Sequence, residues 1–355
     1  MIRDSARQNS ITPNNNNLNN QMNKDDRKYK NNHDVNNDTN NIHGLDQFSM
    51  VVVNNIGDLY LLNLNDNVLP ISLENVTWLH PKWNRSKNYL AILRLDTVKN
   101  MFLYDLNNST LFKATNYTLF GIDDYLWLDD KNILFLQGDN NSKWLHNYDI
   151  DSKSITKLFQ VDAAFKELKI SHVGDIYVFK SDEKILLKAK DGKDVATIPV
   201  QYQDGKVVDI SFLTTISNIG LIQLMNKDNV IQFYLILVTS TAAIDIISTN
   251  KIFAENILYS CAFDENNIYA LTDNKRLIKL FLTFVDNTGW IIDFKSELKL
   301  ENLNNLLDTQ SQQKLKLFCG NNFVGITIED NIFTVFVNDE QVISDYLYNA
   351  KYFDY

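Results

Sequence analysis

A strand-like unit recurs along this chain at nearly constant spacing. Each copy is a polar residue followed by apolar ones, as in Asn88-Tyr-Leu-Ala-Ile and Asn132-Ile-Leu-Phe-Leu. Successive copies begin 44, 43, 43, 49 and 55 residues apart, at Asn88, Asn132, Asp175, Asn218, Asn267 and Asn322. An earlier copy precedes them at Phe48-Ser-Met-Val-Val-Val. A period of this length, built from short strands, restricts the fold more than any other feature of the chain.

Further short strands fit between the copies, for example Phe102–Leu106 and Thr110–Lys113. Four short strands in about 43 residues are typical of one blade of a β-propeller. A lone blade leaves both faces uncovered, so blades must stack on one another and close into a ring. We therefore predict an all-β fold, a seven-bladed β-propeller over residues 47–355. Six or eight blades remain an alternative, because the first and last copies are the least regular.

Two segments depart from the repeat. Residues 1–46 contain fourteen Asn and few apolar residues, so we predict a disordered, Asn-rich N-terminal arm. Residues 297–308 (ELKLENLNNLLD) carry the one helical pattern and are predicted to be a helical insertion between blades. The last blade, 315–344, is expected to exchange a strand with the first. The aromatic C-terminal segment, 346–355, is expected either to close the ring or to dock on a partner.

Two blades resemble known propeller families. Phe102-Leu-Tyr-Asp-Leu and Trp144-Leu-His-Asn-Tyr-Asp-Ile are similar to the third strand of a WD40 repeat, in which an aromatic–Asp pair ends the strand. Pro81-Lys-Trp-Asn-Arg-Ser-Lys-Asn-Tyr-Leu-Ala is also similar to blades of TolB-like and prolyl-peptidase propellers. The WD40 Trp and the preceding Gly-His are missing, so that family's hydrogen-bond network is not implied. The resemblance implies a divergent, WD40-like propeller.

Composition narrows the setting. With 34 Lys and Arg against 44 Asp and Glu, the net charge of −10 disfavours direct binding to nucleic acid or to an anionic membrane. No apolar run reaches the length of a membrane span, and no signal peptide is recognisable. Cys261 and Cys319 form no CxxC motif, so we expect two unpaired, buried apolar side chains in a reducing compartment. The predicted location is the cytoplasm or the nucleus.

Catalytic signatures are missing from the sequence. The five His show no metal-ligand spacing, and His146 and His172 are expected to be structural. No G-x-S-x-G, phosphate-binding loop or dinucleotide motif occurs. The adjacent carboxylates Asp123-Asp124 and Asp129-Asp130 point to opposite faces of a strand or cap turns. The innermost strands are expected to be mostly Val, Ile, Leu and Tyr. We therefore predict no enzyme activity, no cofactor, no metal and no small-molecule substrate.

The remaining candidate is a surface for protein contact. Trp and Arg dominate binding hot spots, and four of the five Trp lie in the second and third blades. The predicted contact residues are Trp78, His80, Lys82, Trp83, Arg85, Tyr352, Phe353 and Tyr355. The structural alternative is that these aromatics fill the space between blades. The predicted function is a non-catalytic scaffold or adaptor subunit, binding other protein subunits of an intracellular eukaryotic complex. The alternatives are an enzyme with a site in the central channel, and an RNA- or DNA-associated subunit with a local basic patch.

Overall fold

The computed structural model describes residues 49–354 except for a set of short gaps and one longer one. The gaps are at 55, 64–67, 73–75, 172–175, 203–204, 213–218, 239–243, 249, 252–254, 265–266, 275, 286–288, 299–314, 321–322, 329–330, 343–346 and 348–349. The predicted N-terminal arm, His172 and Tyr355 lie outside the described residues. Glu297 and Leu298 are the last residues of a strand, and the rest of the predicted helical insertion is also outside them.

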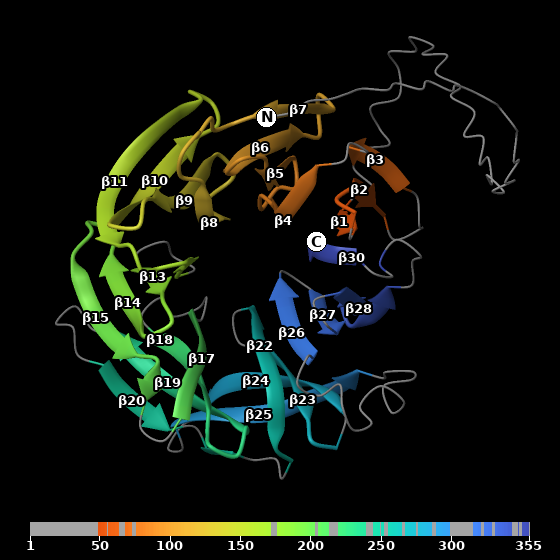
Figure 1. Cartoon of the computed structure of the whole chain (residues 1–355). Coiled ribbons are helices and arrows are strands. Elements are labelled where there is room, and N and C mark those ends of the chain that lie inside the picture. The colour runs from red at the N-terminus through yellow and green to blue at the C-terminus, as the bar shows by residue number, and fades with distance from the viewer. Residues whose placement is uncertain are drawn as a thin grey trace, which may run out of the picture. The chain divides into compact units, whose positions relative to one another are not determined.

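The described residues form seven sheets arranged around a centre, which confirms the predicted seven-bladed β-propeller (Figure 1). All strand pairs are antiparallel except the short pairing of Asn250–Lys251 with Gly289–Leu298. Blade I contains β1 (Met50–Asn54), β2 (Leu59–Leu62), β3 (Val68–Ser72) and β30 (Ala350–Asp354). Blade II contains β4 (Thr77–Trp83), β5 (Tyr89–Leu95), β6 (Lys99–Asp105) and β7 (Thr110–Lys113). Blade III contains β8 (Ile122–Trp127), β9 (Asn132–Gly138), β10 (Ser142–Asp149) and β11 (Ser154–Asp162).

The remaining four blades follow in chain order. Blade IV contains β12 (Glu167–Ile170), β13 (Ile176–Lys180), β14 (Lys184–Ala189) and β15 (Asp194–Pro199). Blade V contains β16 (Gln201–Tyr202), β17 (Gly205–Phe212), β18 (Ile219–Met225), β19 (Ile231–Val238) and β20 (Ile244–Ser248). Blade VI contains β21 (Asn250–Lys251), β22 (Ile257–Asp264), β23 (Asn267–Thr272), β24 (Leu277–Val285) and β25 (Gly289–Leu298). Blade VII contains β26 (Leu315–Gly320), β27 (Phe323–Ile328), β28 (Asn331–Val337) and β29 (Glu340–Val342).

The core lies in the seams between blades. Seven clusters of buried apolar side chains are found among the described residues, one at each seam. Successive side chains of a strand point to opposite faces, so one strand supplies two clusters. In β1, Val51 and Val53 pack toward blade II, while Met50 and Val52 pack toward blade VII. This is why the second strand of each blade is a continuous apolar run rather than an alternating one.

The two ends of the chain meet in blade I. Strand β30 pairs antiparallel with β1, with Val52 opposite Phe353 and Asn54 opposite Ala350. The C-terminal strand is thus the innermost strand of the first blade, beside β4 of blade II (Figure 1). Of the two roles expected for the C-terminal segment, ring closure is confirmed for Ala350–Asp354. Among the described residues no helix has the length and apolar character needed to cross a membrane.

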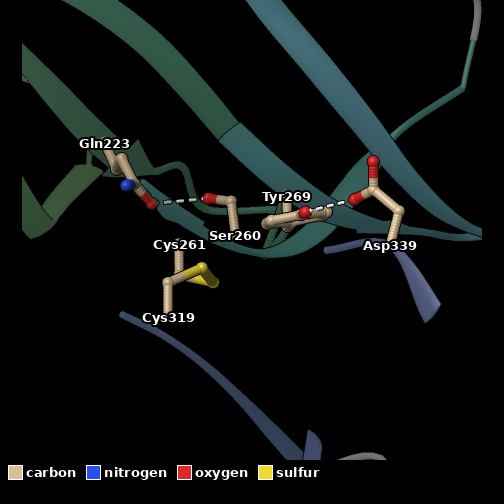
Figure 2. The surroundings of a disulfide bond; sticks show 6 residues. All are labelled: Gln223, Ser260, Cys261, Tyr269, Cys319 and Asp339. Carbon is tan, nitrogen blue, oxygen red and sulfur yellow. Dashed lines mark hydrogen bonds between the residues drawn. A yellow bond between two sulfur atoms is a disulfide. The ribbon is translucent and has the colours of Figure 1, made fainter. Parts of the chain in front are cut away.

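A disulfide joins the innermost strands of blades VI and VII. Cys261 of β22 is bonded to Cys319 of β26, with the two Cα atoms 5.8 Å apart (Figure 2). The expectation of two unpaired cysteines is therefore wrong. Sequence spacing could not reveal the pairing, because the two residues are 58 positions apart and meet only when the two blades stack. Tyr269 Oη also donates a hydrogen bond across this seam to Asp339, and at the preceding seam Ser260 donates to Gln223 (Figure 2).

Replacing both cysteines should destabilise the ring. The disulfide closes a loop of 58 residues, and a cross-link of this kind typically contributes about 2–4 kcal/mol by restricting the unfolded chain. We expect the Cys261→Ala, Cys319→Ala double variant to lose about that much free energy of unfolding in urea. Reductant should lower the stability of the natural chain to the same level and leave the variant unchanged. Equal urea midpoints for the oxidised chain and the variant would contradict this.

His146 is a buried histidine that is held neutral. Its ring stacks on Phe135 at 4.9 Å between centroids, and neither ring nitrogen has a hydrogen-bond partner among the described residues. Desolvation, with a smaller contribution from the Lys157 ammonium, lowers the pKa of His146 to about 4. The role expected from the sequence, a structural histidine in mid-strand, agrees with this position.

His146 makes the fold sensitive to acid. The pKa of His146 is lower in the folded chain than in the unfolded chain. The contribution of neutral His146 to the free energy of unfolding is therefore fully present above about pH 6.5 and is lost as the pH falls toward 4. The loss due to this residue should be about 2 kcal/mol at pH 5. We expect His146→Phe to reduce the difference in unfolding free energy between pH 7 and pH 5 by that amount. If urea titrations gave the same pH 7 to pH 5 difference in unfolding free energy for the variant and the natural chain, protonation of His146 would not destabilise the fold.

Candidate functional site

The structure separates the described contact residues into three sets. Trp78 and Trp83 are buried in the seam between blades I and II, with 1% and 7% of their surface exposed. Arg85 is exposed in the turn between β4 and β5. The other four described residues, His80, Lys82, Tyr352 and Phe353, line a single pocket.

The pocket lies where the ring closes. It has a volume of about 630 Å³ and opens to solvent between the innermost strands β4, β26 and β30. Its apolar wall includes a chain of aromatic contacts, since Phe323 packs against Phe318 at 5.8 Å and against Phe353 at 5.0 Å. On the other side, the His80 ring lies 4.7 Å from the Tyr352 ring. The complete lining is His80, Pro81, Lys82, Lys316, Leu317, Phe318, Cys319, Phe323, Thr327, Ile332, Lys351, Tyr352, Phe353 and Asp354.

The charges of the pocket are mostly positive. Three lysines line it against one carboxylate, Asp354, whose Oδ2 accepts a hydrogen bond from the Trp83 backbone N–H at 2.7 Å. The Lys82 ammonium lies 2.5 Å from the Tyr125 carbonyl oxygen and 3.5 Å from an Asp124 oxygen. Although His80 retains access to solvent, desolvation and the nearby Lys82 charge lower its pKa to about 4, so it is neutral at pH 7.

The innermost strands are more polar than the sequence suggested. The expectation that they are mostly Val, Ile, Leu and Tyr is wrong, because those apolar runs form the second strand of each blade. Acidic groups of the inner strands instead join neighbouring blades. Asp124 of blade III accepts a hydrogen bond from the Leu168 backbone of blade IV at 2.9 Å, and Lys169 of blade IV pairs with Asp209 of blade V.

A second candidate surface consists of exposed apolar side chains in turns and loops of blades I–III. We call it the apolar loop edge and define it as Ile56, Leu95, Leu119 and Phe120, which are 68%, 42%, 78% and 44% exposed. All four lie at the edge where the innermost strands begin. Ile56 is in the β1–β2 turn, Leu95 ends β5, and the other two are in the β7–β8 loop.

Close backbone contacts link the segments that carry the apolar loop edge. Gly57 packs directly on the backbone of Val76, just before β4, leaving no space for a side chain. The next residue, Thr77, pairs with Leu95 in the sheet. In the same way, a Cβ atom on Gly121 would lie only 2.5 Å from the backbone nitrogen of Lys99. The three segments that carry the exposed residues therefore lie against neighbouring backbone from blade I to blade III.

The β7–β8 loop is fixed by Asn100. This side chain is 2% exposed. Its Nδ2 donates to the Tyr117 carbonyl at 3.0 Å, and its Oδ1 accepts from the Tyr117 N–H at 2.6 Å. The Thr115 hydroxyl also donates to Oδ1, and Gln137 donates to the Phe120 carbonyl at 3.0 Å. Leu119 and Phe120 are therefore exposed on an anchored loop rather than on a loose one.

Sequence reasoning missed the apolar loop edge. Its signal was present, since Leu119-Phe120-Gly121 is an apolar pair in a loop that precedes a strand. Within the described ranges, no group of three or more His, Cys, Asp or Glu side chains is placed to hold a metal ion.

Comparison with known proteins shows the fold alone. No protein-family model matches the sequence, and no curated protein matches it at a significant level. Among similar solved structures is TolB from Acinetobacter baumannii, with a TM-score of 0.42, 12% identity, and 70% of this chain and 63% of TolB aligned. The C-terminal WD40 domain of Sif2 has a TM-score of 0.48 and 14% identity, with 77% of this chain and 73% of that domain aligned.

An oligogalacturonate lyase in complex with manganese is also similar, with a TM-score of 0.43, 15% identity, and 52% of this chain and 55% of the lyase aligned. The alignments with TolB and the lyase thus span less than two thirds of those chains. The predicted resemblance to WD40 and TolB-like propellers is confirmed at the level of the fold. At identities this low, no activity of these proteins is transferred to this chain.

Asn100→Ala should release the β7–β8 loop. The change removes the side-chain partners of Tyr117 and Thr115, and leaving buried polar groups unpaired costs about 1–3 kcal/mol. We expect a loss of that size in urea unfolding, together with faster amide exchange over residues 114–121. Asn147→Ala, which removes a hydrogen bond to Asn132 in blade III, serves as the control. Unchanged exchange in the loop of the Asn100 variant would show that Asn100 does not anchor it.

Proposed function

We propose that this protein is a non-catalytic scaffold or adaptor subunit that binds another protein through the apolar loop edge. The observation that supports this most directly is the exposure of Leu119 and Phe120 on a loop fixed by Asn100. Large apolar side chains gathered on a surface are characteristic of protein–protein contact sites. A preformed loop also loses little conformational entropy on binding.

The framework beneath the surface suits this role. Each blade is packed on both faces, and the seam between blades II and III carries additional polar links. Tyr125 Oη donates to the Ala91 carbonyl at 2.8 Å, and Trp127 Nε1 donates to the Lys82 carbonyl at 2.8 Å, both between blades II and III. Such links hold neighbouring turns in fixed relative positions, as a binding surface assembled from several blades requires.

The two alternative functions remain predictions. The polar inner strands weaken one argument against an enzyme with a channel site, since charged groups do line the centre. Several of these groups are already engaged in links between blades, as with Asp124 and Asp209. Nucleic-acid binding is disfavoured by the net charge of −10.

A cytoplasmic or nuclear location also remains a proposal, and the disulfide weighs against it. Disulfides form and persist mainly in oxidising compartments. The pairing of Cys261 with Cys319 therefore favours a location in which thiols are oxidised, or a bond that is formed only under oxidising conditions. Native cells can be quenched with acid and their free thiols alkylated. Mass spectrometry of Cys261 and Cys319 then shows whether the two residues are disulfide-bonded in the cell.

The proposed binding surface is tested with a charged double variant. Leu119→Asp with Phe120→Asp places two carboxylates where an apolar contact is proposed, and both residues are exposed, so the fold should be retained. In affinity purification from native cells, we expect a stoichiometric partner to be reduced at least tenfold. A photo-crosslinking residue at position 119 should join the same partner.

The control variant is Ile155→Asp with Leu158→Asp on the outer strand β11. These side chains are 41% and 40% exposed and lie outside the apolar loop edge. Partner recovery should be unchanged in this variant. If recovery were the same in both double variants, or if the natural chain retained no partner, the apolar loop edge would not be the binding surface.

A further inference from the structure

The pocket at the ring closure has a composition distinct from that of the apolar loop edge. It combines aromatic and aliphatic walls with three lysines in a chain whose net charge is −10. A volume of about 630 Å³ is within the range of pockets that hold small organic ligands. We propose that this pocket binds a small organic anion with an apolar or aromatic body.

The apolar body would lie against the aromatic wall. Phe323 and Phe353 are buried and stacked edge to face, while Phe318, which packs against the same cluster, is only half-buried and lines the pocket. Phe318 is fixed in position, because it pairs with Gly325 on the neighbouring strand and its ring fills the space that a side chain there would need. The wall is therefore formed before a ligand arrives, which limits the cost of binding.

The acidic group of the ligand would be held by the lysines at the opening. Lys316 and Lys351 are both exposed and come from β26 and β30, which belong to different blades. Lys82 of β4 also lines the pocket, but its ammonium lies 3.5 Å from Asp124, so that carboxylate balances part of its charge. The one carboxylate of the lining, Asp354, already accepts a hydrogen bond from the Trp83 backbone. An anion therefore meets an excess of ammonium groups, and charge-assisted hydrogen bonds to carboxylates are among the stronger polar contacts in proteins.

The position of the pocket implies that a ligand joins the last blade to the first. Its lining comes from β26, β27 and β28 of blade VII, from β30 of blade I and from β4 of blade II. A ligand held by Lys316 and Lys351 would therefore bridge the seam that closes the ring. A ligand that binds only the folded chain raises its apparent stability in proportion to the logarithm of its concentration.

The test uses 8-anilino-1-naphthalenesulfonate as an apolar anion and N-phenyl-1-naphthylamine as its uncharged counterpart. We expect the folded chain to bind the anion at one saturable site, followed by fluorescence. Dodecanoate should displace it, and dodecanol should do so less well. Saturating anion should also raise the melting temperature of the chain.

Lys316→Gln with Lys351→Gln should weaken binding of the anion about tenfold while leaving the uncharged probe nearly unaffected. Lys153→Gln with Lys190→Gln removes the same charge from exposed turns and should change neither probe. Phe318→Ala should weaken the binding of both probes.

Three results would overturn the proposal. The natural chain could show no saturable binding, or the two double variants could bind the anion equally. The charged and uncharged probes could also lose affinity to the same extent in the Lys316, Lys351 variant. Leu119→Asp with Phe120→Asp should bind the probes normally, because the site is separate from the apolar loop edge.

Discussion

Ring closure is the constraint on which the rest of this structure depends. Each blade is a thin sheet with two apolar faces, and neither face is covered until a neighbour packs against it. The pairing of β30 with β1 completes blade I, and the cluster around Phe323, Phe353 and Val52 then covers the last open face. Without this step, two blades would each expose an apolar face to water. The C-terminal strand therefore contributes far more stability than its five residues would in an isolated hairpin.

Apolar packing and polar links have different tasks in the seams. The buried clusters supply area that is removed from water, but they do not fix the register of one blade against the next. Directional contacts near the centre provide that register, as between Asp354 and the Trp83 backbone, or between Asp124 and the Leu168 backbone. The VI–VII seam has a covalent contact in addition, from Cys261 to Cys319. The central region of the ring is accordingly polar, while the middle of each blade is apolar.

Much of the fold was predictable from the sequence, and the reason is the repeat. Regular spacing of apolar runs favours seven blades and indicates the strands within them, because each run must span one blade. The order of strands from the centre outward was less accessible. The runs that begin at Tyr89 and Asn132 form second strands rather than innermost ones, and their apolar character follows from cover on both faces by neighbouring blades.

The site was predicted only in part, for a related physical reason. The residue types of His80, Lys82, Tyr352 and Phe353 predict a contact role, and the structure brings the four together in one pocket. Trp78 and Trp83 have the same character as hot-spot residues but fill a seam, and nothing in a single sequence distinguishes these two uses of Trp. The apolar loop edge depends on contacts between turns of different blades, and such contacts leave no local pattern in the sequence.

The pairing of β30 with β1 also places the two ends of the described chain side by side. Val51 lies opposite Asp354, so both ends are at the edge where β1 begins, opposite the edge that carries Ile56. A short linker could join these ends, and the chain could then be opened in another turn. Such a circular permutant would keep every strand pair but move the non-covalent closure to a different blade. The position of the chain ends in blade I is thus not required for the arrangement of strands in the ring.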